Sequence, residues 1–309
     1  MPYYDSAWYA LRNVVYATGC RIYRSQSPTA NFAEVESEAR AYFANAMSVH
    51  SELLLTKPSL RSVRALLAMV IFAEGLASPA LSSGLILNAA LLAHSLGLHL
   101  KTADFASHAD AEALQRCWLF WAVYCCEKHI AQRCGRPSVI NDDEITCEVP
   151  RAVHPGSAIE LEMLTYIIQT CQLYDQTSEP LLSTRALHEP AEKMLSLVAR
   201  FGDQLQSWKA SLPVDLQPAD FLKQFRMPDS MRAMGLMVTH CSFYDLVIGV
   251  HSIFLYPWVI DSFAGTMDAN LALMVREQVK NSSQQVANAA RSLIVIARSL
   301  DMGQAGTQS

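Results

Sequence analysis

The strongest constraint on the fold is an apolar periodicity of three to four residues that recurs along the chain between Gly and Pro breaks. It is clearest where Leu85, Ala89, Leu92 and Leu96 follow one another at helical spacing and Gly97 stands where a helix would end. This segment is apolar on nearly every side, which predicts a central helix. Only 12 Gly and 13 Pro occur in 309 residues, and sparse turn residues favour helices over sheets. The sequence therefore predicts an all-α protein, a multi-helix bundle.

The same periodicity predicts the positions of the individual helices. We expect helices at residues 6–25, 32–54, 59–74, 85–97, 111–133, 159–176, 190–211, 230–255 and 274–300. Residues 138–157 show no period and carry acidic residues and prolines, so we expect an ordered loop there. We expect one helical domain over residues 1–302 and a disordered tail over residues 303–309. A connection at residues 214–228, which contains Pro218 and Pro228, is the candidate boundary within that domain.

Charge and hydropathy exclude several classes of protein. The formal net charge is −5 and no run of Lys or Arg occurs, which argues against direct contact with nucleic acid. The first residues lack the basic start and apolar run of a secretory signal. Glu74 and Pro79 interrupt the apolar segment at residues 65–81, and the segment at 247–260 is short, so neither predicts a membrane span. We expect an intracellular protein, cytoplasmic or nuclear, with no membrane partner.

The eight cysteines predict free thiols and no metal site. They are scattered through helical patterns, in a chain without a secretory signal, and no C-x-x-C pair occurs among them. The sequence also lacks a phosphate-binding glycine loop, a dinucleotide fingerprint and a nucleophile elbow. We therefore expect no cofactor.

One motif identifies a family resemblance. The sequence LFWAVYCCEKHIAQRCGRPSVINDDEI begins at Leu119 and is followed by Val149 and Pro150. It resembles the central signature of the fungal-specific transcription factor domain, the middle homology region of zinc-cluster transcription factors. The matching positions are Phe120, Trp121, Tyr124, Gly135, Arg136, Pro137, Ile140, Asp142, Ile145 and Pro150.

The resemblance is weaker outside this centre. Glu127 and Glu144 stand where the family favours Asp, and Ala131 where it often has a small hydroxyl residue. Residues 93–99, 208–213 and 242–259 resemble flanking family segments. The resemblance implies an all-α regulatory domain. The six-cysteine zinc cluster that precedes this domain in the family is not found in the sequence, so we expect a stand-alone form that does not read DNA itself.

Two functions are consistent with such a domain. The first, slightly favoured from the sequence, is an enzyme of secondary metabolism that binds an apolar terpenoid or polyketide and promotes a Diels–Alder-type cyclisation. The resemblance supplies the precedent, since factor-like proteins without the zinc cluster take part in ring formation in fungal gene clusters. An apolar cavity and a hydrogen-bond donor would suffice for that reaction. The alternative is a regulator of a biosynthetic gene cluster that senses a metabolite. Both functions need an apolar small molecule as partner. The sequence leaves open whether the protein forms a homodimer.

The candidate site residues come from the apolar helices. The expected catalytic donors are Tyr124, Gln132, His240, Tyr244 and His251, and the expected substrate-binding residues are His94, Trp121, Glu127, Phe243 and Trp258. Each also has a simpler structural interpretation: aromatic stripes are usually core, and a helical histidine is usually bonded to a carbonyl. We expect Arg136 to fix the loop by pairing with the acids at 142–144.

Overall fold

Helices form every regular element in the part of the chain that the computed structural model describes, which is residues 5–25, 27, 31–101, 111–153, 161–217, 231–263 and 267–306. The all-α expectation is thus confirmed. The chain divides into two compact units, Met1–Ser157 and Ala158–Ser309, so the division does not fall at residues 214–228. The single domain expected over residues 1–302 spans both units and stays a prediction.

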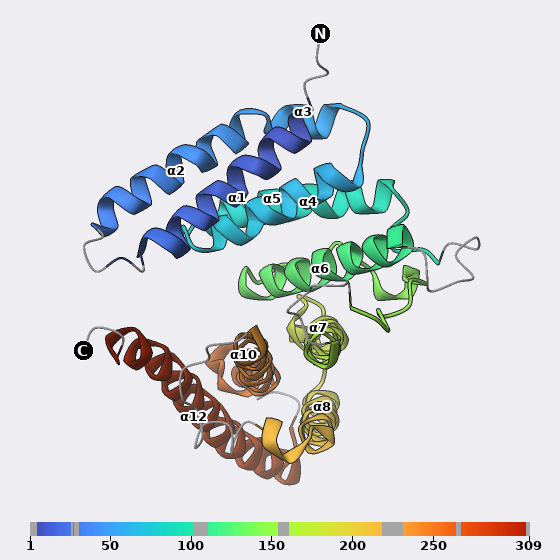
Figure 1. The fold of residues 1–309 in the computed structure, drawn as a ribbon. Helices are drawn as coiled ribbons and strands as arrows, with labels where there is room; N and C mark the ends of the chain where they lie inside the picture. Colours follow the sequence, from blue (N-terminus) through green and yellow to red (C-terminus); the bar gives the residue numbers. More distant parts are fainter. Residues whose placement is uncertain are drawn as a thin grey trace. The chain divides into compact units, whose positions relative to one another are not determined.

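Unit 1 is built from two helical hairpins and one further long helix (Figure 1). Its elements are α1 (Ser6–Ser25), α2 (Phe32–Ser48), α3 (His50–Leu55), α4 (Leu60–Glu74), α5 (Pro79–Ser95), α6 (Ala111–Arg133) and the 3-10 turn η1 (Asp142–Glu144). Helix α1 packs against α2 and α4, α4 packs against α5, and α6 packs against α5 and α4. Fully buried alanines, Ala10 and Ala17 on α1 with Ala39 and Ala46 on α2, line the first hairpin. Small side chains let the two helix backbones approach closely.

Local side-chain chemistry sets the helix ends in unit 1. Ser59 and Ser62 form a reciprocal capping box at the start of α4: Ser62 N donates to Ser59 Oγ at 3.1 Å and Ser59 N to Ser62 Oγ at 2.9 Å. The single helix expected over residues 32–54 is wrong, because α2 ends at Ser48. There Ser48 Oγ donates to Asn45 O at 2.7 Å and competes for a helical carbonyl.

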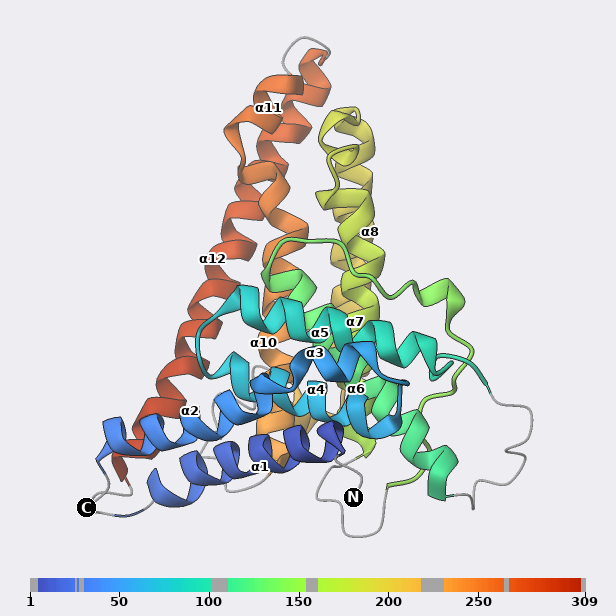
Figure 2. The same cartoon turned by 90° about the horizontal axis from the view of Figure 1, so that it is seen from above.

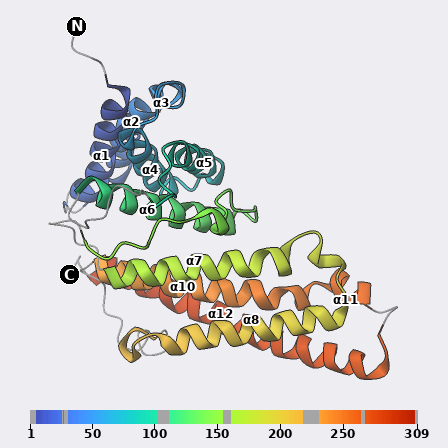
Figure 3. The same ribbon diagram turned by 90° about the vertical axis from the view of Figure 1, so that its right-hand side faces the viewer.

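In the residues that the structure describes, unit 2 contains four long helices that run beside one another (Figure 3). Its elements are α7 (Leu161–Leu182), η2 (Ala186–His188), α8 (Ala191–Ser211), η3 (Val214–Leu216), α10 (Met231–Ser252), η4 (Ile253–Leu255), α11 (Pro257–Phe263) and α12 (Ala269–Gly306). Helix α10 packs against α7, α8 and α12. Helix α11 lies at the end of the bundle where α12 begins (Figure 2).

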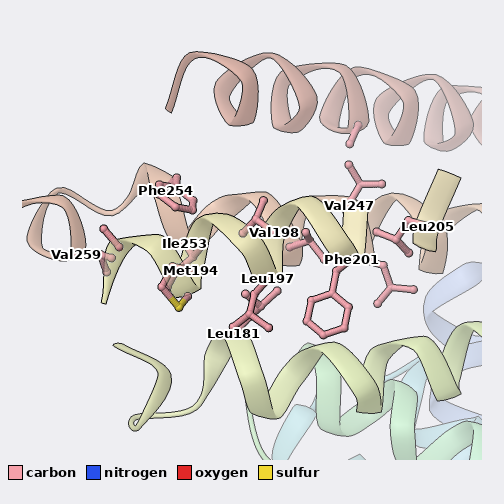
Figure 4. Close-up of a cluster of buried hydrophobic side chains, with 14 of the residues drawn as sticks. Leu181, Met194, Leu197, Val198, Phe201, Leu205, Val247, Ile253, Phe254 and Val259 are labelled. Carbon is pink, nitrogen blue, oxygen red and sulfur yellow. The ribbon is translucent and has the colours of Figure 1, made fainter. Parts of the chain in front are cut away.

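One large apolar cluster joins the helices of unit 2 (Figure 4), and Met163, Leu216 and Leu236 form a second, smaller cluster. Leu181, Val198, Phe201 and Phe254 are each 2% exposed or less and come from α7, α8 and η4. Each such side chain stabilises the fold by about 1.5–3 kcal/mol relative to exposure. The segment Gly235–Leu255 is long and apolar enough to cross a membrane by length and composition, with a mean hydropathy of 1.3. More than half of it is buried inside the unit, as in a core helix.

Several helices differ in extent from the sequence-based expectation. Helix α5 begins at Pro79, which takes a first-turn position that needs no N–H donor. Helix α7 continues to Leu182 with Pro180 inside it. Helix α11 was not expected, and α12 spans residues 269–306. Residues 303–306 of the expected tail are therefore helical, and residues 307–309 lie outside the described part of the chain.

Candidate functional site

The end of α6 turns the chain back over its own helix. Gly135 has φ +62°, Gly135 N donates to Gln132 O at 3.1 Å, and Arg136 N donates to Ala131 O at 3.0 Å. These two bonds define a Schellman cap, in which glycine avoids the steric cost of the left-handed conformation. The turn directs residues 136–150 along α6, so the motif residues of the helix and the loop meet in unit 1.

Glu127 is the first of two buried charged residues on α6 that hold this loop. Its carboxylate, fully buried, accepts hydrogen bonds from Arg136 Nη1 at 2.8 Å, Ser138 Oγ at 2.5 Å and Val139 N at 3.3 Å. Arg136 therefore does fix the loop through a carboxylate, but its partner is Glu127 and not the acids at 142–144. The cap at Gly135 explains this difference, because it places Arg136 beside the preceding helix. Arg136 Nε and Nη2 are buried without a hydrogen-bond partner.

Lys128 is the second buried charged residue. Its Nζ donates to Ile140 O at 2.7 Å and pairs with Asp142 Oδ1 at 2.9 Å. Tyr124 completes the group, since its hydroxyl donates to Asp142 Oδ2 at 2.9 Å and its ring centroid lies 5.2 Å from Lys128 Nζ. The aromatic face and the carboxylate both favour the ammonium charge, so the buried lysine is compensated.

The later part of the loop is held by indole and thiol donors from α6. Glu148 O accepts from Trp121 Nε1 at 3.0 Å and from Cys117 Sγ at 3.1 Å, and Ala152 O accepts from Trp118 Nε1 at 2.9 Å. The Trp121 and Tyr124 rings meet edge to face with centroids 5.1 Å apart. Both aromatic rings are buried, so these predicted site residues act in packing and in anchoring the loop.

Two thiols meet between α6 and this loop. Cys117 Sγ and Cys147 Sγ lie 3.7 Å apart, and both residues are partly exposed. The interaction between the two sulfurs lowers the pKa of Cys147 and raises the pKa of Cys117. Of the two thiols, Cys147 is therefore the one that loses its proton more readily. Cys147 N also donates to His99 O at 2.9 Å.

The remaining predicted residues of unit 1 lie at helix ends. Gln132 supplies a carbonyl to the cap at the end of α6. His94 supplies a carbonyl to Gly97 N at 2.8 Å at the end of α5, where Gly97 has φ +63°. The His94 ring meets that of His99 edge to face, with centroids 4.7 Å apart. Burial lowers the pKa of His99.

The two predicted histidines of unit 2 form buried hydrogen bonds. His240 is fully buried, and its Nε2 donates to Leu216 O at 2.8 Å, which connects α10 to η3. His251 Nδ1 lies 3.2 Å from Ser282 Oγ on α12, and Ser282 Oγ also accepts from Gln278 Nε2 at 2.9 Å. Burial lowers the pKa of both histidines, so the neutral imidazole is favoured.

The predicted aromatic residues of unit 2 divide between core and surface. Phe243 is buried and stacks on Trp208 with centroids 5.7 Å apart, and Tyr244 meets Phe243 edge to face at 5.4 Å. Burial raises the pKa of Tyr244. Trp258 is 62% exposed and stacks on Tyr256 with centroids 4.7 Å apart.

Unit 2 also carries a groove of about 530 Å³ between α12 and the segment formed by η4 and α11. Its lining residues are Phe254, Leu255, Pro257, Ile260, Asp261, Val275, Arg276, Val279 and Ser283. The groove is mainly apolar, with one cation, one anion and one hydroxyl. It has the chemistry to bind an apolar small molecule that carries a polar or anionic group.

The structure does not bring the predicted residues to this groove. Half of the ten belong to each unit, and none of them is among its lining residues. Their expected roles at one shared pocket stay a prediction. Sequence reasoning missed Lys128 and the groove residues. The sequence signal that could have identified Lys128 is a lysine inside an apolar helix of the motif. The groove depends on α11, which the apolar periodicity of the sequence did not predict.

Comparison with known proteins agrees with the family resemblance of the central motif. The family model described as "Fungal specific transcription factor domain" matches residues 3–210. The chain is 30% identical over 261 residues to the ABC-transporter-regulating transcription factors of Aspergillus oryzae and Aspergillus fumigatus, covering 81% of this chain and 28% of each relative. It is 28% identical over 309 residues to the Fusaridione A cluster transcription factor of Fusarium heterosporum, covering 94% of this chain and 54% of that relative.

The relatives are longer proteins. The chain spans between about a quarter and about half of the length of these curated relatives. No solved structure matches the chain.

Proposed function

The chain belongs to the fungal-specific transcription factor domain family, and we propose that it acts as a regulator of transcription, as the helical regulatory part of such a factor. The observation that carries this proposal is the family match over residues 3–210, which includes the whole of α6 and its loop. Curated relatives named as transcription factors support it. A regulator of this kind acts in the nucleus.

The expectation of a pericyclase is wrong. Relatives that match most of this chain are named as transcription factors, one of them a cluster transcription factor. The buried histidines and Tyr244, expected as catalytic donors, make core contacts in unit 2 that are consistent with a structural role.

The regulated genes are the next part of the proposal. One group of relatives is named for regulating ABC transporters and another for the fusaridione A cluster. By analogy we propose that this chain controls genes for export or for secondary metabolism. The net charge of −5 supports a role in which these residues do not themselves contact DNA.

An apolar small molecule is the proposed effector, and the groove at η4, α11 and α12 is its proposed site. Phe254, Ile260 and Val279 would cover an apolar body, and Arg276 would pair with an anionic group. Arg276 is exposed, so its charge is available at the groove. The effector would shift transcription only if it binds one conformation of the protein better than another.

Disruption of the gene in its native fungus tests the regulatory proposal. RNA sequencing with and without added lipophilic compounds should show a coordinated loss of transcripts from a transporter or biosynthetic gene set. A wild-type copy should restore these transcripts. Unchanged transcripts under every condition would overturn the proposal.

Binding of 1-anilinonaphthalene-8-sulfonate to the purified chain tests the groove, because this probe combines an apolar body with a sulfonate. Val279→Trp should fill the groove and weaken binding about tenfold, a loss of about 1.4 kcal/mol. Arg276→Gln should weaken it less. Leu273→Trp is the matched control, since Leu273 is exposed on the same helix and is not a lining residue. If all variants bind the probe as tightly as the unchanged chain does, the probe does not bind in the groove and the proposed effector site is wrong.

A further inference from the structure

Two cysteines from different parts of unit 1 lie close enough to react with one another. Cys117 is on α6 and Cys147 is in the loop after η1, yet their Sγ atoms are 3.7 Å apart. A disulfide requires about 2.05 Å, so the sulfurs must approach by roughly 1.7 Å. Cys147 belongs to a stretch without helix or strand, where rotation of its side chain and a small backbone shift can supply this movement.

Both thiols are accessible to a small oxidant. Cys117 and Cys147 are partly exposed, whereas Cys20 and Cys171 are buried. Reaction with peroxide needs a thiolate, and the contact with the Cys117 sulfur lowers the pKa of Cys147. Sulfenic acid formed at Cys147 would then have a resolving thiol within van der Waals distance.

We propose that Cys117 and Cys147 form a peroxide-oxidisable dithiol, and that the disulfide ties the loop of residues 134–153 to α6. This site does not depend on the proposed transcriptional function. The disulfide would constrain the same loop that Glu127 and Lys128 hold through ion pairs and hydrogen bonds. It would therefore add a covalent, reversible restraint to that loop.

The chemistry balances with one peroxide molecule. The Cys147 thiolate attacks one peroxide oxygen, an S–O bond forms, the O–O bond breaks, and the leaving hydroxide takes a proton to become water. Cys117 sulfur then attacks the Cys147 sulfenic sulfur, so the S–S bond forms and the S–O bond breaks. The departing hydroxide takes the Cys117 proton as a second water. The two thiols lose two electrons and peroxide gains them, and an added dithiol reverses the change.

Oxidation also exchanges one contact for another. The Cys117 thiol no longer donates to Glu148 O once its sulfur is in the disulfide, while Trp121 Nε1 still does. The new bond closes a loop of about 30 residues, and a cross-link of this length restricts the unfolded chain. The oxidised chain should therefore unfold at a higher temperature than the reduced chain.

The test uses the purified full chain with Cys134→Ser, which removes an exposed thiol that would join two molecules. Equimolar hydrogen peroxide is followed by alkylation with N-ethylmaleimide, digestion without reductant and mass spectrometry. We expect a cross-linked peptide pair containing Cys117 and Cys147 that dithiothreitol separates, together with a rise in Tm. Cys117→Ser should abolish both results. Cys241→Ser should change neither, because Cys241 is a partly exposed thiol in unit 2.

Three outcomes would overturn the inference. If N-ethylmaleimide alkylates both cysteines after peroxide treatment, or if Cys147 proceeds to sulfinic acid with Cys117 still free, the pair is not a dithiol switch. If the cross-link forms but the Tm stays the same as in the Cys117→Ser variant, the disulfide does not fix the loop. A Cys147→Ser variant with an unchanged Tm before oxidation would show that the reduced fold tolerates replacement of the thiol.

Discussion

Lys128 Nζ lies 2.9 Å from Asp142 Oδ1, and the two side chains differ sharply in exposure. The lysine side chain has no exposed surface, whereas 29% of the aspartate side chain is exposed. Loss of the carboxylate therefore leaves a buried cation without its partner, while loss of the lysine leaves an anion that water and the Tyr124 hydroxyl still reach. The two halves of this ion pair should not contribute equally to stability.

Asp142→Ala should cost about 3–5 kcal/mol of unfolding free energy, because it leaves the buried ammonium uncompensated. Lys128→Met should cost about 1–3 kcal/mol, mainly because Ile140 O loses the hydrogen bond from the ammonium group. Urea unfolding of the purified variants measures both values. The double variant should recover part of the Asp142→Ala loss. Equal costs, or a larger cost for Lys128→Met, would contradict this account.

The central motif shows how far sequence reasoning reached. The extent of α6 and the loop after it followed from periodicity and from the break at Gly135. The anchoring role of Arg136 also followed from its chemistry. Its partner did not, because Glu127 and the acids at 142–144 are all close in sequence. Only the backbone geometry of the cap determines which carboxylate faces the guanidinium.

Unit 2 shows where that reasoning failed. Helix α10 was predicted from its apolar length, but α11 is too short to give a periodic signal. The groove lies between α12 and the segment formed by η4 and α11, so its lining could not be predicted without the tertiary arrangement. His240 and His251 were correctly placed in apolar helices. Their bonds to Leu216 and Ser282 join elements far apart in sequence.

The cap at Gly135 gives a prediction with an internal control. Gly135→Ala should cost about 1 kcal/mol, since φ is +62° and no atom lies within 4 Å of the added Cβ, so that backbone strain is the only effect. Gly84→Ala should instead stabilise by about 0.5–1 kcal/mol, because Gly84 is exposed inside α5 and also has no atom within 4 Å. Thermal unfolding should show shifts of opposite sign. An unchanged or raised Tm for Gly135→Ala would exclude strain at Gly135.

Arg21 joins three helices of unit 1 and should not tolerate replacement by lysine. Its Nε and Nη2 donate to the two oxygens of Glu36 at 2.9 and 2.8 Å, and its guanidinium carbon lies 3.8 Å from the Phe72 ring centroid. Lysine loses the paired donors and the stacking, which should cost about 1–2 kcal/mol. Arg40→Lys is the control, since Arg40 makes one bond to Glu36 and is 57% exposed. Urea unfolding should separate the two variants, and equal losses would count against a special role for Arg21.

The buried histidines predict how stability depends on pH. Burial is the main cause of the lowered pKa of His240, with the bond to Leu216 O opposing it, so the folded protein binds a proton there less readily than the unfolded chain. The unfolded chain takes up protons as the pH falls through its ordinary value near 6.5, and the folded state loses stability from there down to the lowered folded value. Urea unfolding at pH 7.5 and pH 5.5 should therefore show a lower free energy of unfolding at pH 5.5.

The His240→Gln variant tests whether His240 causes this pH dependence. It should be less stable than the unchanged chain at pH 7.5, and its free energy of unfolding should differ less between the two pH values. A variant with an undiminished difference would assign the pH dependence to other groups, among them His251 and His129, whose pKa values burial also lowers.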